Sequence, residues 1–164
     1  MKNLVVLLLL FSASALANTL TEYSFGKIVI GMKPEEALKI LKGYSSDKLN
    51  YEESYSCYYL APKNNSKAVY VMVESGIVSR FDVMHKELNV KTSRGIGIGS
   101  NKLSVLKAYP NTIASPHRYI GPGGEYLEVE LKNGNRIIFE TDKDIVTSFR
   151  LGSNPAVGYI EGCL

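Results

Sequence analysis

The segment RGIGIGSNKLSVLKAYP, from Arg94 to Pro110, sets three glycines ahead of an apolar pattern with helical spacing. Such a turn can present backbone N–H groups to a phosphate at the start of a helix. A Walker A loop, however, needs Lys and then Ser or Thr directly after a glycine, and a dinucleotide turn needs a third glycine where Ser100 stands. We therefore expect a strand-to-helix corner here, and no nucleotide or other cofactor.

Serines with nearby lysines and pairs of carboxylates are the other candidates for catalysis. The pattern Ser-x-x-Lys, in which a lysine activates a serine, occurs at Ser24–Lys27, Ser45–Lys48 and Ser104–Lys107. Carboxylate pairs occur at Glu35/Glu36, Glu52/Glu53 and Glu128/Glu130. Neither set has the partners that a penicillin-recognising enzyme or a glycosidase needs. We predict that the chain is not an enzyme; a small hydrolase, inactivated by one Ser or Glu substitution, is an alternative.

The cysteines and histidines offer almost nothing for a metal site. The chain has two histidines, His85 and His117, and two cysteines, Cys57 and Cys163, without a Cys-x-x-Cys pair. In an exported protein an isolated cysteine pair favours a disulfide, and two free thiols are the alternative. A Cys57–Cys163 bond would tie the end of the chain to its first half. In the chain-entropy model it would contribute at most about 4–5 kcal/mol to the stability of the fold.

The N-terminus, MKNLVVLLLLFSASALA, has the pattern of a secretory signal peptide. Lys2 precedes an apolar run, and the small residues that end at Ala17 suit cleavage. The run is short for a membrane span, so an anchor is the weaker alternative. We expect a periplasmic or secreted protein with no stable membrane anchor. Its formal net charge of +3 falls to +2 without Lys2, and this weak charge offers no footprint for nucleic acid.

One offset aligns two parts of the chain. A shift of 68 residues, from Ile28 to Ile96, places Ile28–Gly31 on Ile96–Gly99. The same shift aligns Leu38 with Leu106, Tyr58 with Tyr126, and 78–81 with 146–149. A fixed offset of this kind is typical of a duplicated structural unit.

Each repeat predicts a short strand that ends in glycine, then a helix, then a tyrosine-rich strand and a hairpin. The helices are expected at 33–41, with Pro34 in the first turn, and at 101–109. Turn signals occur at Glu74-Ser75-Gly76, Asn133-Gly134 and 141–144. The predicted fold is α+β: two tandem repeats, each a helix packed on a small antiparallel β-sheet. The predicted boundaries are 1–17 for the signal peptide, 18–83 for the first repeat, 84–94 for a linker and 95–164 for the second repeat.

Eleven tyrosines and no tryptophan mark the chain, and many of the tyrosines fall on or beside predicted strands. Strand alternation assigns one parity to the core, namely Val69, Val71, Val73, Ile77, Phe81, Val83, Ile137, Phe139, Ile145, Phe149 and Leu151. The opposite, outer face carries the predicted protein-binding residues Tyr58, Tyr70, Met72, Arg80, Tyr126, Arg136 and Arg150. Tyr, Met and Arg beside acidic groups are typical of protein-binding surfaces. The alternative is that the N-terminal segment, the linker or the other repeat covers this face.

The plan of GMKPEEAL from Gly31 to Leu38, a helix, and strands that end in Val-x-x-Phe resembles the tandem-repeat fold of the β-lactamase inhibitor proteins (BLIP-like). It is also similar to the BamE (SmpA/OmlA) group of outer-membrane assembly lipoproteins, with Gly99, Leu106 and 146–149 as the matching residues of the second repeat. The resemblance implies a non-catalytic envelope protein. The inhibitors grip an enzyme with a concave surface of two sheets, and the lipoproteins serve an assembly machine. The chain departs from the lipoproteins in having two units and from the inhibitors in lacking tryptophan.

Together these observations predict an exported, non-catalytic protein-binding module. The expected partner is another protein, a periplasmic or cell-wall enzyme, which the module inhibits or sequesters by blocking the active site with its outer sheet face. The alternative is an envelope structural or assembly factor that binds an outer-membrane protein complex or peptidoglycan. No metal, cofactor or nucleic acid is expected to bind.

Overall fold

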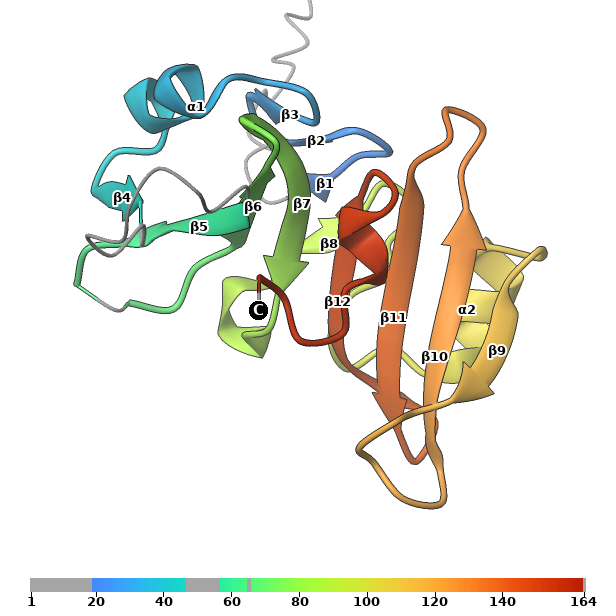
Figure 1. Cartoon of the computed structure of the whole chain (residues 1–164). Helices are drawn as coiled ribbons and strands as arrows, with labels where there is room; N and C mark the ends of the chain where they lie inside the picture. Colours follow the sequence, from blue (N-terminus) through green and yellow to red (C-terminus); the bar gives the residue numbers. More distant parts are fainter. Residues whose placement is uncertain (1–18, 47–56, 65, 164) are drawn as a thin grey trace, which may run out of the picture.

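The computed structural model describes residues 19–46, 57–64 and 66–163 (Figure 1). The predicted signal peptide lies outside the described residues. The elements are β1 (Thr19–Leu20), β2 (Ser24–Phe25), β3 (Ile28–Val29), α1 (Pro34–Ile40), β4 (Tyr44–Ser46), β5 (Cys57–Pro62), β6 (Tyr70–Glu74), β7 (Ile77–Val83), η2 (Lys86–Leu88), β8 (Lys91–Thr92), α2 (Lys102–Ala108), β9 (Ile113–Pro116), β10 (Gly124–Glu130), β11 (Arg136–Asp142), β12 (Ile145–Gly152) and η3 (Ala156–Gly158).

The strands join into two sheets that run through both halves of the chain. The large sheet has eight strands in the order β4-β5-β6-β7-β12-β11-β10-β9, and the small sheet has four in the order β3-β2-β1-β8. Strand β7 pairs with β12, with Phe81 opposite Leu151. The predicted α+β fold of two helix-on-sheet repeats is therefore wrong. The described part of the chain is mostly β with two α-helices. The β7–β12 hydrogen bonds merge the strands of both halves into one sheet, so the two halves do not form separate sheets.

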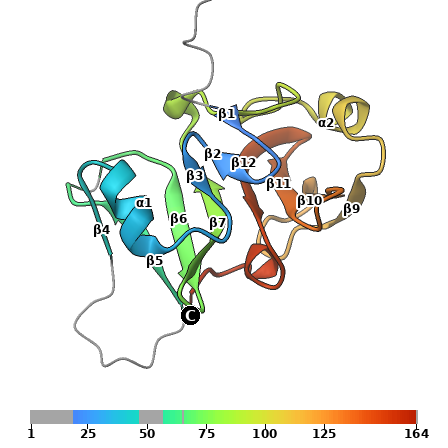
Figure 2. The same ribbon diagram turned by 90° about the horizontal axis from the view of Figure 1, so that it is seen from above.

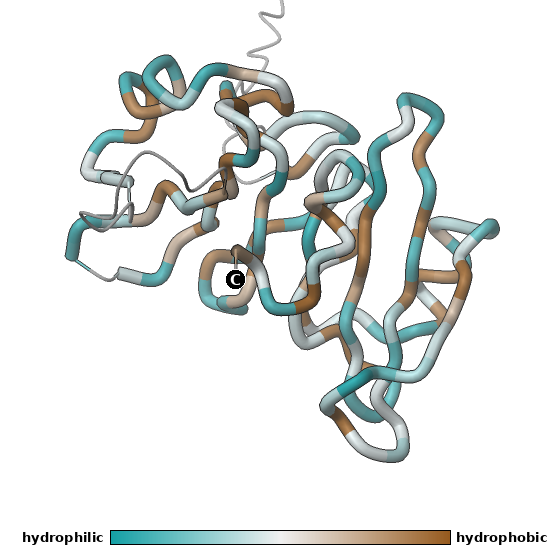
Figure 3. The backbone as a smooth tube through the Cα atoms, in the orientation of Figure 1, coloured by the Kyte–Doolittle hydropathy of each residue, from teal (hydrophilic) through white to brown (hydrophobic). Residues whose placement is uncertain are grey.

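The hydrophobic core lies on the inner face of the large sheet, the face that carries the small sheet and the helices. Phe81, Phe139 and Phe149 are at most 2% exposed there. Ala37 of α1 and Val105 of α2 belong to the same cluster. Figure 2 shows the small sheet between α1 and α2, and Figure 3 shows apolar residues recurring along the strands. The core therefore occupies the inner face of the large sheet, and the outer face carries side chains outside this core.

The two helices begin and end within the predicted ranges, and each has seven residues. Pro34 opens α1 at a position where its missing N–H costs nothing. The Asn101 side chain accepts a hydrogen bond of 2.8 Å from the Ser104 amide and caps α2. Helices this short are unstable alone in water, so their packing on the core stabilises them.

The glycine-rich corner before α2 makes the same sheet contacts as the corner before α1. The Gly99 amide donates to the Val146 carbonyl at 2.8 Å, as the Gly31 amide does to the Val78 carbonyl. Both glycines have a positive φ, 91° and 90°, which disfavours other residues. The Gly99 amide is therefore used by the sheet, as a strand-to-helix corner requires.

Gly97 is explained by a close approach of two chain segments. A Cβ atom on Gly97 would lie 2.6 Å from the Val90 carbonyl oxygen. Residue 97 also forms an antiparallel bridge with Lys91. The run GIGIG thus lets the chain pass close to the segment before β8.

Two β-bulges change which side chains face the core. The pairing of β6 with β7 shifts between Met72 and Val73, and that of β11 with β12 shifts between Glu140 and Thr141. Each extra residue reverses the alternation beyond it. Val78 and Val146 are consequently fully buried in the core cluster. Ile77 and Ile145, predicted for the core, are half-buried and 42% exposed, respectively.

The residues predicted as a linker, 84–94, contain η2 and β8. Strand β8 pairs in parallel with β1, with Leu20 opposite Thr92, so this segment completes the small sheet. None of the helices in the described residues has the length and apolarity needed to cross a membrane.

Candidate binding site on the outer face of the large sheet

The C-terminal segment, residues 153–163, lies across the outer face of the large sheet, on the side away from the small sheet (Figure 2). It starts with a 2.9 Å hydrogen bond from the Ser153 amide to the Ser79 carbonyl. Val157 of η3 is fully buried against Tyr126 and Ile138, two outer-face residues. The segment ends at the predicted Cys57–Cys163 disulfide, which is confirmed, with 5.4 Å between the Cα atoms. The sequence suggests the N-terminal segment, the linker or the other repeat as a cover for the outer face. In the structure, the C-terminal segment covers it instead.

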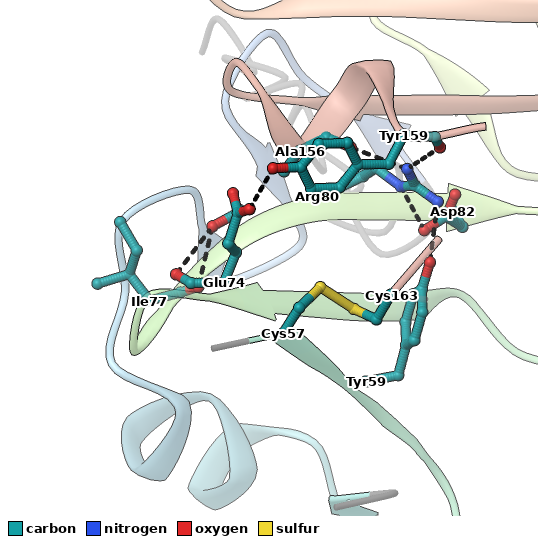
Figure 4. The surroundings of a disulfide bond; sticks show 10 residues. Cys57, Tyr59, Glu74, Ile77, Arg80, Asp82, Ala156, Tyr159 and Cys163 are labelled. Atoms are coloured by element: carbon teal, nitrogen blue, oxygen red, sulfur yellow. Dashed lines mark hydrogen bonds and ion pairs between the residues drawn. A yellow bond between two sulfur atoms is a disulfide. The ribbon is translucent and has the colours of Figure 1, made fainter. Parts of the chain in front are cut away.

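Arg80 of β7 holds the C-terminal segment by its backbone (Figure 4). Its Nε donates to Asp82 Oδ2 at 2.9 Å, and its Nη1 donates to the carbonyls of Ala156 at 2.9 Å and Tyr159 at 2.7 Å. Its Nη2 donates to the Tyr59 hydroxyl at 2.8 Å. With 4% of Arg80 exposed, the guanidinium is an interior group whose charge is balanced by a neighbouring carboxylate.

Arg150 of β12 makes the matching contacts in the second half of the sheet. Its Nε donates to the Val157 carbonyl at 2.8 Å, and its Nη1 forms an ion pair with Glu140. Arg150 lies opposite Asp82 where β7 and β12 pair. Two arginines and two carboxylates therefore alternate across the centre of the outer face with balanced charge.

His117 extends this network toward β10. Its ring stacks on Tyr126 with 4.3 Å between centroids. Its Nδ1 accepts from the Tyr119 and Ile120 amides, both at 3.1 Å, so the proton of the neutral ring sits on Nε2. That Nε2 lies 3.3 Å from Glu140 Oε2 and donates to it.

Burial and neighbouring charges shift the pKa values of the two carboxylates, Asp82 and Glu140, in opposite directions. Burial raises the pKa of Asp82, and the charge and hydrogen bond of Arg80 oppose that rise. Burial also acts to raise the pKa of Glu140, but the charge of Arg150 and the hydrogen bonds that Glu140 accepts outweigh it and lower the pKa. Burial raises the pKa of Tyr59 far above its ordinary value, so its hydroxyl stays protonated.

A cavity of about 500 Å³, here called the central hollow, opens beside this network. Its floor includes Arg80, Asp82, Glu140 and Arg150, its walls include Tyr59, Tyr70 and Met84, and residues 160–162 close one side. Met84 is 52% exposed and Ile160 is 38% exposed, so apolar groups stand at its edge. The volume lies in the range of about 300–1,000 Å³ that is usual for binding sites.

The polar groups of the hollow do not have the arrangement of a serine-hydrolase triad. Ser148 Oγ donates to Glu140 Oε2 at 3.0 Å, and His117 contacts the same oxygen. In a serine hydrolase the histidine stands between the serine and the carboxylate, whereas Glu140 occupies that middle position here. Within residues 19–46, 57–64 and 66–163, His, Cys, Asp and Glu form no group of three or more that could hold a metal ion.

The predicted binding residues are distributed over different environments. Tyr70 lines the central hollow, as do Arg80 and Arg150. Met72 is fully buried beneath the outer face, and Tyr126 is 6% exposed. Arg136 stands apart from the hollow and pairs with Glu128 at 3.2 Å.

Tyr58 lies on the opposite face from the one predicted. It pairs with Val73, a core residue, and packs against the core cluster. The neighbouring Tyr59 pairs with Met72 and takes the outer position. The offset of 68 suggested that Tyr58 and Tyr126 are equivalent, but the register of β5 turns Tyr58 inward.

The residues missed by sequence reasoning are Tyr59, Glu140, His117, Met84 and Ile160. Glu140 shares the parity of Asp82 and of the two arginines, so a search for opposite charges across neighbouring strands could have found it. Nothing in the sequence marks Ile160, because its place depends on where the disulfide holds the chain end.

Known proteins offer one fold comparison. No protein-family model matches the chain, and no curated protein matches it. A solved structure with a similar fold is an extracellular protein containing a SCP domain from Bacillus anthracis str. Ames, at a TM-score of 0.51 and 17% sequence identity. The match covers 76% of this chain and 44% of that one, so this chain spans less than half of that protein. At this identity the likeness concerns the fold alone.

Proposed function

We propose that the protein is an exported, non-catalytic module that binds another protein by receiving a protruding segment in the central hollow. The observation that carries the proposal is the hollow itself, with a charge-balanced floor and exposed apolar groups at its edge. An exposed apolar group beside a formed cavity is the arrangement by which binding surfaces anchor a partner.

Export is supported by three independent features. The N-terminal sequence has the pattern of a signal peptide, and the Cys57–Cys163 disulfide suits an oxidising compartment. The structurally similar protein is described as extracellular. We place the module in the periplasm or outside the cell, where an enzyme of the cell wall is the partner class we favour.

The test is capture of partners from an envelope extract of the source cells by the immobilised mature protein. The site variant is Met84→Glu combined with Ile160→Glu, which puts charge at the apolar edge of the hollow. The matched control is Leu103→Glu on α2, because Leu103 is 77% exposed and lies outside the hollow. We expect the control to retain the captured protein and the site variant to lose it.

The identity of the captured protein separates the two roles. A single soluble enzyme whose activity falls on binding indicates inhibition or sequestration. Capture of membrane barrel proteins or peptidoglycan indicates an assembly role. No contact among the described residues points specifically to that role. Equal capture by the site variant and the control contradicts the central hollow as the binding site.

A further inference from the structure

The C-terminal segment has two parts that are held in different ways. Residues 153–158 form an anchor, in which Ala156 and Val157 are fully buried and receive hydrogen bonds from Arg80 and Arg150. Residues 160–163, here called the strap, follow Tyr159 and are largely exposed or half-buried. The anchor is secured by packing, whereas the strap needs another cause for its position.

The strap separates two hollows on the outer face. Ile160, Glu161 and Gly162 line the central hollow. The same three residues line a second hollow of about 490 Å³, together with Cys57, Glu74 and Arg118. The strap is therefore a partition, and moving it would join the two hollows into one longer groove.

Noncovalent contacts hold the strap weakly compared with the anchor. Tyr159, at its start, is fixed by the Arg80 contact to its carbonyl and by its hydroxyl, which donates to Glu74 at 2.5 Å. Beyond it, Glu161 accepts a hydrogen bond from Tyr119, which is 58% exposed, and exposed polar pairs contribute little. Among the residues that the structure describes, the remaining tie of the strap is the disulfide at Cys163.

The path of the strap depends on a glycine. A Cβ atom on Gly162 would lie 2.9 Å from the Tyr59 hydroxyl, and the φ of Gly162 is +76°. The strap thus passes close to Tyr59, which lines the central hollow. Removing the strap would uncover the Tyr59 ring between the two hollows.

We infer that the strap is a disulfide-latched gate, closed in the oxidised protein and opened by a dithiol reductant. In the exchange, one reductant thiolate attacks a sulfur of the Cys57–Cys163 bond, and its second thiol completes the exchange. Both cysteines become thiols, and the reductant leaves as a disulfide. Cys57 and Cys163 line the second hollow and are half-buried, so the bond is reachable from that side.

This inference rests on the proposed function in taking the central hollow as the binding site. The oxidised protein admits a short protrusion of a partner, because the strap closes one end. The reduced protein offers a continuous groove from Glu74 past Tyr59 to Glu140, which fits an extended polypeptide segment. Release of the strap withdraws Ile160 from the edge of the hollow and opens the longer groove, so the reduced protein should favour an extended segment over a short protrusion.

The test is backbone ¹⁵N relaxation by NMR on the mature protein, which measures strap motion without any partner. Samples are the oxidised protein, the protein reduced with dithiothreitol, and the variant Cys57→Ser/Cys163→Ser. We expect order parameters of residues 160–163 to fall from about 0.85 to below about 0.6 on loss of the bond, with 153–158 unchanged. The control Tyr119→Phe removes the Glu161 contact but keeps the disulfide, and its strap should stay rigid.

Two results would overturn the inference. One is a strap that stays rigid after reduction, which would mean that its hydrogen bonds suffice. The other is loss of order in the anchor or in β5–β7, or unfolding of the chain, which would make the bond a tie for the whole fold. A mobile strap in a protein that captures no partner supports the gate and counts against the proposed function, so the two are tested separately.

Discussion

Arg80 and Arg136 project from the same face of one sheet, yet they stand in different surroundings. Arg80 is 4% exposed and donates to Asp82, Tyr59 and two carbonyls of the C-terminal segment. The Arg136 side chain is 33% exposed and pairs with Glu128, while its Nε has no hydrogen-bond partner within the described residues. The difference shows that the cover supplied by the chain end, and not the strand sequence, decides whether an outer-face charge is structural or accessible.

The largest effect is expected for Arg80→Met, which tests the covered side of this comparison. The change leaves Asp82 buried without its partner and two carbonyls of the C-terminal segment without a donor. Breaking one partner of a buried ion pair costs about 3–5 kcal/mol. Urea unfolding at neutral pH measures the loss in the free energy of unfolding.

A second variant sharpens that result. Arg80→Met combined with Asp82→Leu removes both charges, so it should recover part of the lost stability. If Arg80→Met alone is as stable as the wild type, the guanidinium is not the interior anchor that its contacts indicate.

A somewhat smaller effect is expected for Tyr126→Ala. Tyr126 is 6% exposed, stacks on His117 and packs with Val157, so its truncation leaves a cavity that costs about 3 kcal/mol. Thermal unfolding measures this loss of stability. The matched change Tyr119→Ala, at a ring that is 58% exposed, should cost less than about 1 kcal/mol. Equal losses for both would show that η3 does not cover Tyr126.

The pH dependence of stability compares the two covered carboxylates. The lowered pKa of Glu140 means that its ionised form stabilises the fold above the ordinary value of about 4.3, and this contribution is lost as the pH falls through the lowered pKa. The raised pKa of Asp82 has the opposite sign, so between about 3.9 and its raised value stability rises as the pH falls.

Two substitutions separate these contributions. Glu140→Gln should flatten the loss of stability in acid, and Asp82→Asn should steepen it. Urea unfolding at a series of pH values between about 3 and 7 gives both slopes. Identical slopes in the two variants would contradict the opposite shifts.

The smallest effect is expected for Arg136→Met on the open side. The Arg136–Glu128 pair lies at 3.2 Å with about a third of each side chain exposed, and such pairs contribute about 0–1 kcal/mol. Urea unfolding beside Arg80→Met makes the comparison direct. A loss as large as that of Arg80→Met would show that exposure does not separate the two arginines.

Local features of the fold were predictable because they depend on neighbours in the sequence. Both helices fall within the predicted ranges, and the turns at Ser75-Gly76, Gly134 and Lys143-Asp144 have the positive φ angles that tight hairpins need. The shift of 68 residues also reappears in the hydrogen bonds of Gly31 and Gly99. These signals do not reveal that β7 pairs with β12, because that pairing joins residues far apart in the chain.

The candidate site was only partly predictable for the same reason. Parity placed Arg80, Arg150 and Tyr70 on the outer face, but it could not detect the bulges that turn Val78 inward and Ile145 outward. Tyr58 was assigned to the outer face by analogy with Tyr126, and the register of β5 decides otherwise. A shift of one residue changes the face of a strand residue without any trace in composition.

The sequence by itself determined the helices, the hairpins, the strand-to-helix corners and the cysteine pair, since each follows from short-range geometry or from residue chemistry. Only the tertiary structure decided that the two sets of strands form one sheet, and that the C-terminal segment lies on its outer face. Those outcomes rest on contacts between distant residues, among them Arg80 with Tyr159 and Cys57 with Cys163. Burial, which makes one arginine structural and leaves another accessible, exists only once those contacts have formed.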